Sequence, residues 1–205
     1  MKILHIDCSV RSGESYSKQL SGYFVEQLRN RKPDILVDYL DLAMAAPRHV
    51  SALFIESTYC PPNLRTPEML EELAESDALV DRMLAAELYI IGMPMYNFTI
   101  PSNFKAFIDN IVRAGRTYRN TSTGIEGLLT EKKAVVINTR GVDFSHDMIA
   151  SMDQLQPYLK TIFGFIGLND THFINVYPVK FSSEELRSKA ILKAQTEIAA
   201  MVESL

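Results

Sequence analysis

The sequence predicts an α/β fold in which helices cover both faces of a parallel sheet. Short apolar runs rich in β-branched residues alternate with segments whose apolar residues follow helical spacing. Some runs, such as residues 88–91, are apolar at every position, which is typical of strands buried on both faces. Strict alternation of strands and helices implies parallel strands joined by crossover helices. The predicted strands are residues 2–8, 35–40, 88–93, 134–138 and 173–179.

Helical spacing predicts five helices between and after these strands. Ser182 and Ser183 precede Glu184 and Glu185, a pattern that favours a helix start. The segment 43–66 contains several prolines and is predicted to be irregular, either a lid or a surface excursion. The predicted helices are residues 15–31, 67–86, 102–114, 149–166 and 182–204.

Length and composition limit the classes of protein that this chain can belong to. With 205 residues and 47% apolar content, it suits a single domain over residues 1–205. A net charge of -4 argues against nucleic acid as a partner. No apolar run reaches the roughly 20 residues of a membrane span, so a cytoplasmic protein is expected. Cys8 and Cys60 lack metal-ligand spacing and are expected to be reduced thiols.

The loop after the first strand is rich in hydroxyl groups. Ser9, Ser12, Ser15 and Ser17 surround the start of a helix, whose free N–H groups and dipole favour an anion. With Gly13 as its one glycine, the loop lacks both GxGxxG and GxxxxGK[ST], so a monophosphate suits it better than a dinucleotide or ATP. Alternatively, Ser15 only caps the helix while Ser9 and Ser12 are ordinary turn residues.

The loop after the third strand combines flat apolar side chains with one amide. It reads Gly-Met-Pro-Met-Tyr-Asn-Phe-Thr-Ile-Pro over residues 92–101. A planar heteroaromatic ring with a hydrogen-bonding edge would suit Met95, Tyr96, Asn97 and Phe98. The alternative is a hydrophobic cluster that seals the end of the sheet.

The fourth strand ends in a glycine-containing loop, residues 138–144. Gly141 would let the backbone approach a ligand closely or adopt positive φ, or it serves only the turn. His146, just beyond, is expected to be an exposed loop residue, and His5 a packed core residue.

Arg11 in the first loop is ambiguous, since a lone arginine is more often solvated than ligand-bound.

With these loops in view, the chain resembles the FMN-dependent NADH-azoreductase and NAD(P)H-quinone reductase family of flavodoxin-like proteins. The resemblance covers nearly the whole chain, and the PMYNF string at residues 94–98 is its most specific part. The other matching strings are QLS at 19–21, RAG at 113–115, EGL at 126–128, KKA at 132–134, RG at 140–141 and FGFIG at 163–167.

The resemblance implies a doubly wound, five-stranded parallel sheet in the order 2-1-3-4-5 and an FMN site. The FMN phosphate would be held by Ser9, Ser15, Tyr16 and Ser17. The isoalloxazine ring would be lined by Pro94, Met95, Tyr96, Asn97 and Phe98. Its pyrimidine side would meet Thr139, Arg140, Gly141 and Val142, the last standing where many relatives carry a second glycine.

The resemblance also implies a homodimer with a flavin site near each subunit interface. Tyr118 would reach toward the partner's flavin and help to form the substrate pocket. Ile162 and Phe144 would be further residues of that pocket.

The implied reaction needs no catalytic side chain, because the flavin carries the chemistry. NADH or NADPH would deliver a hydride to flavin N5 and leave, and a quinone would then take two electrons on the same face. Aromatic azo compounds would be surrogate substrates. Asn97, Gly141 and the N–H of Val142 are candidates for stabilising the reduced ring.

An electron carrier or flavin-binding protein without enzymatic activity is the alternative on the same fold. A carrier should lack a pocket for nicotinamide. The polar excursion of residues 116–127, which contains Tyr118, favours the enzyme.

Overall fold

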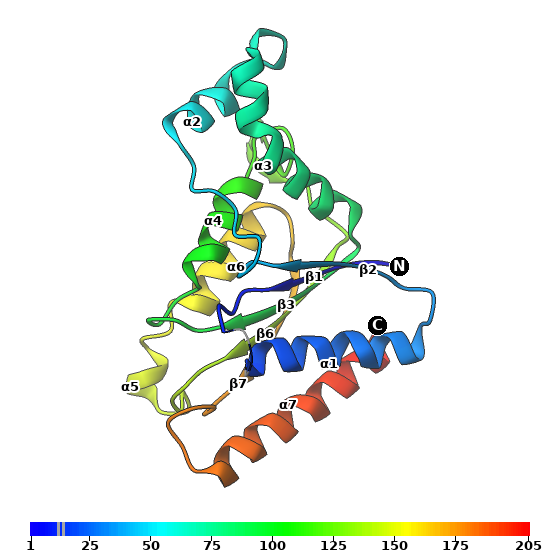
Figure 1. Ribbon diagram of the computed structural model, residues 1–205, viewed down its shortest axis with the longest axis vertical. Coiled ribbons are helices and arrows are strands. Elements are labelled where there is room, and N and C mark those ends of the chain that lie inside the picture. The colour runs from blue at the N-terminus through cyan, green and yellow to red at the C-terminus, as the bar shows by residue number, and fades with distance from the viewer. Residues whose placement is uncertain (12, 14) are drawn as a thin grey trace.

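A five-stranded parallel sheet forms the centre of the protein, in the order β2-β1-β3-β6-β7 (Figure 1). The computed structural model describes residues 1–11, 13 and 15–205. The strands of the sheet are β1 (Lys2–Asp7), β2 (Leu36–Asp41), β3 (Leu88–Pro94), β6 (Lys133–Thr139) and β7 (Asp170–Val176). Counted along the chain within this sheet, the order is 2-1-3-4-5, as the resemblance implies. All five predicted strands are confirmed, although β7 begins and ends earlier than expected.

Helices cover both faces of the sheet, as predicted. Figure 1 shows α1 (Tyr16–Arg31) and α7 (Glu184–Ser204) side by side on one face. The opposite face carries α3 (Pro67–Ala85), α4 (Ser102–Ile111) and α6 (Leu155–Phe165).

The fully apolar strand β3 explains why the sheet is buried on both sides. Leu88 and Ile90 belong to the core under α1 and α7. Tyr89, Ile91 and Met93 belong to the core under the helices of the other face. Because successive side chains of a strand point to opposite faces, a continuous apolar run supplies both cores.

The predicted helix 149–166 is wrong as a single helix. The chain forms a short helix, α5 (Asp147–Ala150), and then begins α6 separately at Leu155. The Asp153 carboxylate accepts the backbone N–H groups of Leu155 at 2.9 Å and Gln156 at 3.1 Å. This satisfies free donors of a new helix start, and Pro157 in the first turn is compatible only with such a start.

The predicted helix 102–114 is three residues too long, because α4 ends at Ile111. The Thr117 hydroxyl donates to the Ile111 carbonyl at 2.7 Å and accepts the Arg113 N–H at 2.9 Å. This side chain therefore satisfies the backbone groups that a longer helix would have paired.

The segment 43–66 is not irregular throughout, contrary to the prediction. It contains α2 (Ala52–Tyr59) and the 3-10 turn η1 (Pro62–Leu64). Ser51 caps α2 by accepting the Phe54 N–H at 2.9 Å, which is a local helix signal that the nearby prolines obscure. Figure 1 shows α2 beside α3 on an arm that extends beyond the sheet.

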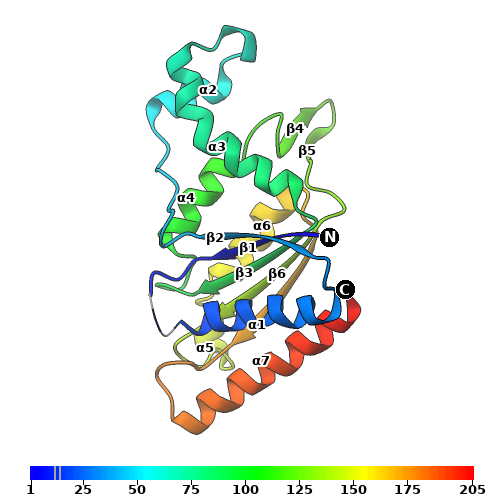
Figure 2. The ribbon, with the colours of Figure 1, turned by 45° about the vertical axis from the view of Figure 1, so that its right-hand side comes forward.

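The polar excursion of residues 116–127 forms an antiparallel hairpin, β4 (Tyr118–Thr121) and β5 (Gly124–Gly127), visible in Figure 2. The backbone of Gly127 packs against Gly167, so closely that any side chain at position 127 would overlap it. The Tyr118 ring lies against Phe165, with ring centroids 4.7 Å apart. These contacts fix the hairpin at the end of α6.

Two observations bear on the expectations from composition. Among the described residues, no helix combines the length and apolar content needed to span a membrane. Both cysteines are free; Cys8 is fully buried and Cys60 is partly exposed.

Candidate functional site

A cavity of about 650 Å³ lies where the carboxyl ends of the parallel strands meet. This is the edge at which α/β sheets bind ligands. Loops following β1, β3, β6 and β7 form its walls. The lining residues are Ser9, Arg11, Ser15, Tyr16, Pro94, Met95, Tyr96, Asn97, Phe98, Thr139, Gly141, Val142, Phe144, Val179, Lys180 and Phe181.

The cavity brings together most of the residues that the sequence nominated. Of the predicted cofactor residues, Ser17 and Arg140 do not line it, and Phe144 of the predicted substrate pocket does. Ser17 is fully buried behind Ser15, with 3.1 Å between the two hydroxyl oxygens. Ser12 lies outside the described residues.

Two predicted substrate-pocket residues do not line this cavity within one chain. Tyr118 packs on Phe165, and Ile162 packs against the core beneath α6. The resemblance assigns Tyr118 to the partner's site, so its absence from this chain's own cavity agrees with that prediction without testing it.

One end of the cavity is built from hydroxyl groups and the start of α1. Ser15 is the N-cap of α1 and accepts the Lys18 N–H at 3.4 Å. Ser9, which is buried, accepts the Arg11 N–H at 3.3 Å. Ser15 therefore caps the helix and lines the cavity at once. Hydroxyls and N–H groups at a helix N-terminus suit a phosphate group.

Beneath this end, a buried carboxylate ties β1 to α1. Asp7 accepts the Ser21 hydroxyl at 2.7 Å and the Tyr39 hydroxyl at 2.9 Å, and His5 lies 3.7 Å away. Burial raises the pKa of Asp7, but His5 and the two hydroxyl donors outweigh burial and lower it. His5 itself is buried, as predicted.

Gly92 of β3 lies directly against Asp7 and Ser21. A Cβ at Gly92 would fall 2.6 Å from the Ser21 hydroxyl oxygen, 2.9 Å from the Ser17 carbonyl oxygen, and closer still to Asp7. The absence of a side chain at position 92 therefore lets α1 approach the sheet and sets where its N-terminus lies.

Flat apolar side chains on a tight turn after β3 also line the cavity. Tyr96 and Thr99 exchange two backbone hydrogen bonds, each of 3.0 Å. The turn holds Asn97 at φ 48° and Phe98 at φ 67°. The second value is unusual for a bulky residue, so surrounding contacts must hold it.

Gly141, in the loop after β6, does not adopt positive φ. Positive φ was one of the uses expected for this glycine. Instead, the Gly141 carbonyl accepts the N–H groups of Lys180 at 3.1 Å and Phe181 at 2.9 Å. A Cβ at Gly141 would lie 3.3 Å from the Phe181 ring. Close approach is thus the role of this glycine.

Sequence reasoning missed the wall formed by Val179, Lys180 and Phe181, and it left Arg11 undecided. The signal available was β7 itself, since the loop after any strand of a parallel sheet starts at the ligand-binding edge. His146, in contrast, is exposed as predicted and does not line the cavity.

The lining limits the chemistry that the cavity supports. Among the described residues, no Asp, Glu, His or Cys side chain lines it. Catalysis by a carboxylate, an imidazole or a thiol therefore has no residue here, and the titratable side chains that do line the cavity are those of Arg11, Tyr16, Tyr96 and Lys180. The arrangement suits a bound planar group with a phosphate at the helix end and hydrogen-bonding atoms near Asn97 and Gly141. Its volume lies within the usual range of cofactor sites.

The sequence matches the family described as having the flavodoxin-like fold, over residues 1–202. It is 44% identical over 199 residues to an FMN-dependent NADH:quinone oxidoreductase of Nostoc punctiforme, covering 97% of this chain and 96% of that protein. It is 41% identical over 204 residues to an enzyme of the same name from Azospirillum brasilense, covering 98% of this chain and 97% of that protein.

Two solved structures share the fold at low sequence identity. The azoreductase from Bacillus anthracis superposes with a TM-score of 0.91 at 24% identity, over the whole of both chains. An FMN-dependent NADH-azoreductase of the same species, solved in complex with FMN, superposes with a TM-score of 0.86 at 22% identity, over 98% of this chain and 99% of the other.

Proposed function

Because the chain belongs to the flavodoxin-like family that contains the FMN-dependent NADH:quinone oxidoreductases, we propose that it passes two electrons from NADH through FMN to quinones. Aromatic azo compounds are surrogate oxidants of the same cycle. The observation that carries the proposal is the cavity, in which an anion-binding helix start and an aromatic turn face one volume. Such a combination suits a planar heteroaromatic ring that carries a phosphate, as FMN does.

Each part of the chain has a defined task in this proposal. Ser9, Ser15 and the N–H groups at the start of α1 bind the phosphate, with Tyr16 beside them. Met95 and Tyr96 exclude water from the apolar end.

The pyrimidine edge meets polar atoms on the other side of the cavity. The Asn97 amide and the backbone N–H groups near Gly141 and Val142 orient that edge and favour negative charge there. Bound FMN supplies the hydride chemistry that no side chain of the cavity provides. Val142 lines the cavity and is 36% exposed, so its side chain occupies space that a glycine at this position would leave to an oxidant.

The test is a visible spectrum of protein reconstituted with FMN and freed of excess, followed anaerobically. We expect the flavin absorbance to bleach when NADH is added and to recover when a benzoquinone follows. Bound flavin that NADH cannot bleach would instead indicate an electron carrier. Failure to retain FMN would contradict the proposal at its base.

We also propose that the protein is a homodimer. Large apolar side chains stand exposed on the arm formed by α2, η1 and α3, as a buried interface would require. They include Leu53, Ile55, Tyr59, Leu64 and Leu70. Light scattering on a sizing column is expected to give twice the mass of the chain. A mass equal to one chain at micromolar concentration would contradict the dimer.

A further inference from the structure

Arg140 carries a buried charge immediately behind the cavity wall. Its side chain is 5% exposed and does not line the cavity, although the next residues, Gly141 and Val142, do. The guanidinium donates to Asp153 at 2.9 Å and to Asn175 at 3.0 Å. Burial lowers the pKa of Arg140, and the Asp153 charge opposes that shift. The side chain of Arg140, which the resemblance assigned to the FMN site, is thus bonded to Asp153 and Asn175 and does not line the cavity.

Asp153 connects the Arg140 charge to the part of the cavity wall that is formed by the turn after β3. One oxygen of Asp153 accepts from Arg140, and the other accepts the first N–H groups of α6. The adjacent Gln154 donates its backbone N–H to the Phe98 carbonyl at 2.9 Å. Phe98 is the residue held at φ 67° in the turn after β3. Two hydrogen bonds, joined by the peptide bond between Asp153 and Gln154, therefore link the loop after β6 to the turn after β3.

Arg140 also supports the aromatic part of the wall. Its guanidinium carbon lies 4.6 Å from the centre of the Phe144 ring and 5.5 Å from the centre of the Tyr177 ring. Phe144 is buried and lines the cavity. An arginine over an aromatic face is attracted to it, so the charge also orients this ring.

We propose that Arg140 is a positioning residue for FMN binding. Through Asp153, it holds the turn after β3, which contains Phe98, and the loop after β6, which contains Gly141, in the relative placement that FMN requires. This inference rests on the proposed function, because it assigns how the chain prepares the site for that cofactor. Arg140 acts through Gly141, Phe98 and Phe144, all of which line the cavity, and contacts no bound group itself.

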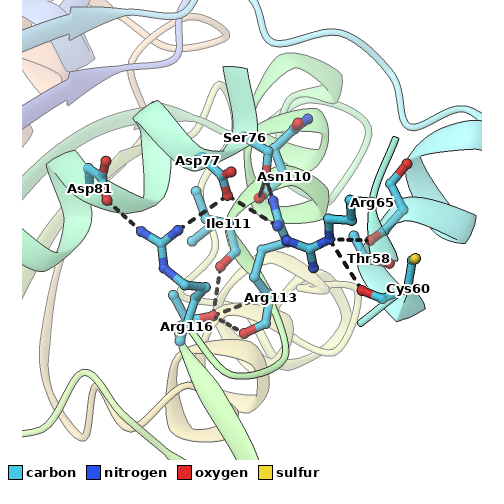
Figure 3. A network of polar contacts seen from close by, with 12 residues as sticks. Thr58, Cys60, Arg65, Ser76, Asp77, Asp81, Asn110, Ile111, Arg113 and Arg116 are labelled. Carbon is cyan, nitrogen blue, oxygen red and sulfur yellow. Dashed lines mark hydrogen bonds and ion pairs between the residues drawn. The ribbon is translucent and has the colours of Figure 1, made fainter. Parts of the chain in front are cut away.

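A second buried arginine in the chain provides a matched control. Arg113 is as buried as Arg140, pairs with Asp77 at 3.1 Å and lies 5.7 Å from the centre of the Phe54 ring. Figure 3 shows that its network joins α3 to the end of α4, with Arg116 and Asp81 at its edge. None of these residues lines the cavity.

The experiment compares Arg140→Met with Arg113→Met. FMN is titrated into each apoprotein at a temperature where circular dichroism shows it folded, and each melting temperature is measured. Removing one partner of a buried pair destabilises both variants. Arg140→Met is expected to weaken FMN binding by about 10- to 100-fold, as loss of buried charged hydrogen bonds predicts. Arg113→Met is expected to bind FMN as the wild type does.

Asp153→Asn separates positioning from folding. The amide oxygen of asparagine still accepts the Leu155 and Gln156 N–H groups, so the start of α6 is kept while the pair with Arg140 is lost. We expect a weaker FMN affinity and an altered visible circular dichroism of the bound flavin at saturation. The double variant with Arg140→Met should be no weaker than the worse single variant, because both changes break one linkage.

The outcomes distinguish this inference from the proposed function. If Arg140→Met does not fold, Asp153→Asn and Arg140→Lys decide the matter. Wild-type FMN affinity and an unchanged flavin spectrum in the folded Arg140 and Asp153 variants would overturn the positioning role alone. Equal losses in Arg140→Met and Arg113→Met would overturn it too, as a general effect of stability. Failure of the wild type to bind FMN would overturn the proposed function instead.

Discussion

Ser15→Asp is expected to abolish retention of FMN while leaving the apoprotein folded. Aspartate caps a helix as well as serine does, and its charge is favourable at a helix N-terminus. The same carboxylate would stand in the cavity at the end proposed for the phosphate, which carries nearly two negative charges at neutral pH. Repulsion at about 4 Å in a partly buried site is worth about 4 kcal/mol, or roughly a thousand-fold in affinity. Titration of FMN into the apoprotein measures the loss.

Ser15→Asn is the matched control for that charge. Asparagine has the size of aspartate and the same capping ability but no charge. We expect Ser15→Asn to bind FMN far more tightly than Ser15→Asp, with similar melting temperatures of the two apoproteins. Equal affinities of the two variants would show that the phosphate does not bind at the start of α1.

Gly92→Ala is expected to have the largest effect on stability of any single methyl group added to the described glycines near the cavity. The new Cβ would meet Asp7, the Ser21 hydroxyl and the Ser17 carbonyl inside hard-contact distance. The helix α1 must therefore move outward and break the buried hydrogen bonds of Asp7. Overpacking of this kind costs about 3 kcal/mol or more. Denaturant unfolding of the apoprotein measures this loss in the free energy of unfolding. The affinity of Gly92→Ala for FMN should fall as well.

Gly22→Ala, in the middle of the same helix, is the control. A Cβ at Gly22 would meet nothing within 4 Å, so alanine should stabilise α1 by about 0.5 to 1 kcal/mol. The two substitutions add the same methyl group and are expected to act in opposite directions. A Gly92→Ala protein as stable as the wild type would refute the close approach of α1 to β3.

The part of the fold that could be predicted is the part that the local spacing of apolar residues indicates. Apolar residues mark each of the five strands of the sheet, although the edge strands β2 and β7 also carry polar residues, and both faces could be recognised as buried from β3 alone. The hairpin β4–β5 escaped because its strands are four residues long and polar. The break before α6 was not predicted because helical apolar spacing continues across it. Asp153 and Pro157 were the sequence signals for a new helix start.

The site could be predicted as far as its loops follow strands of the sheet. Three loops were found because their composition is unusual, and the edge of the sheet brings them together. The position of Lys180 and Phe181 after β7 was the signal for this wall, but the hydrogen bonds to the distant Gly141 carbonyl that hold it cannot be read from the local sequence. The direction of the Arg140 side chain likewise depends on Asp153 and Asn175, which come from other parts of the chain.

The burial of Cys8, next to Ser9 of the cavity, affects how the protein withstands its own substrates. Quinones are electrophiles that add to thiolates, and only the deprotonated thiol is an effective nucleophile. Burial, together with the charges of Asp7 and Asp41, raises the pKa of Cys8, so the thiol stays protonated. It is also enclosed, with no exposed surface. Repeated turnover should therefore spare the loop after β1, which lines the cavity, from alkylation.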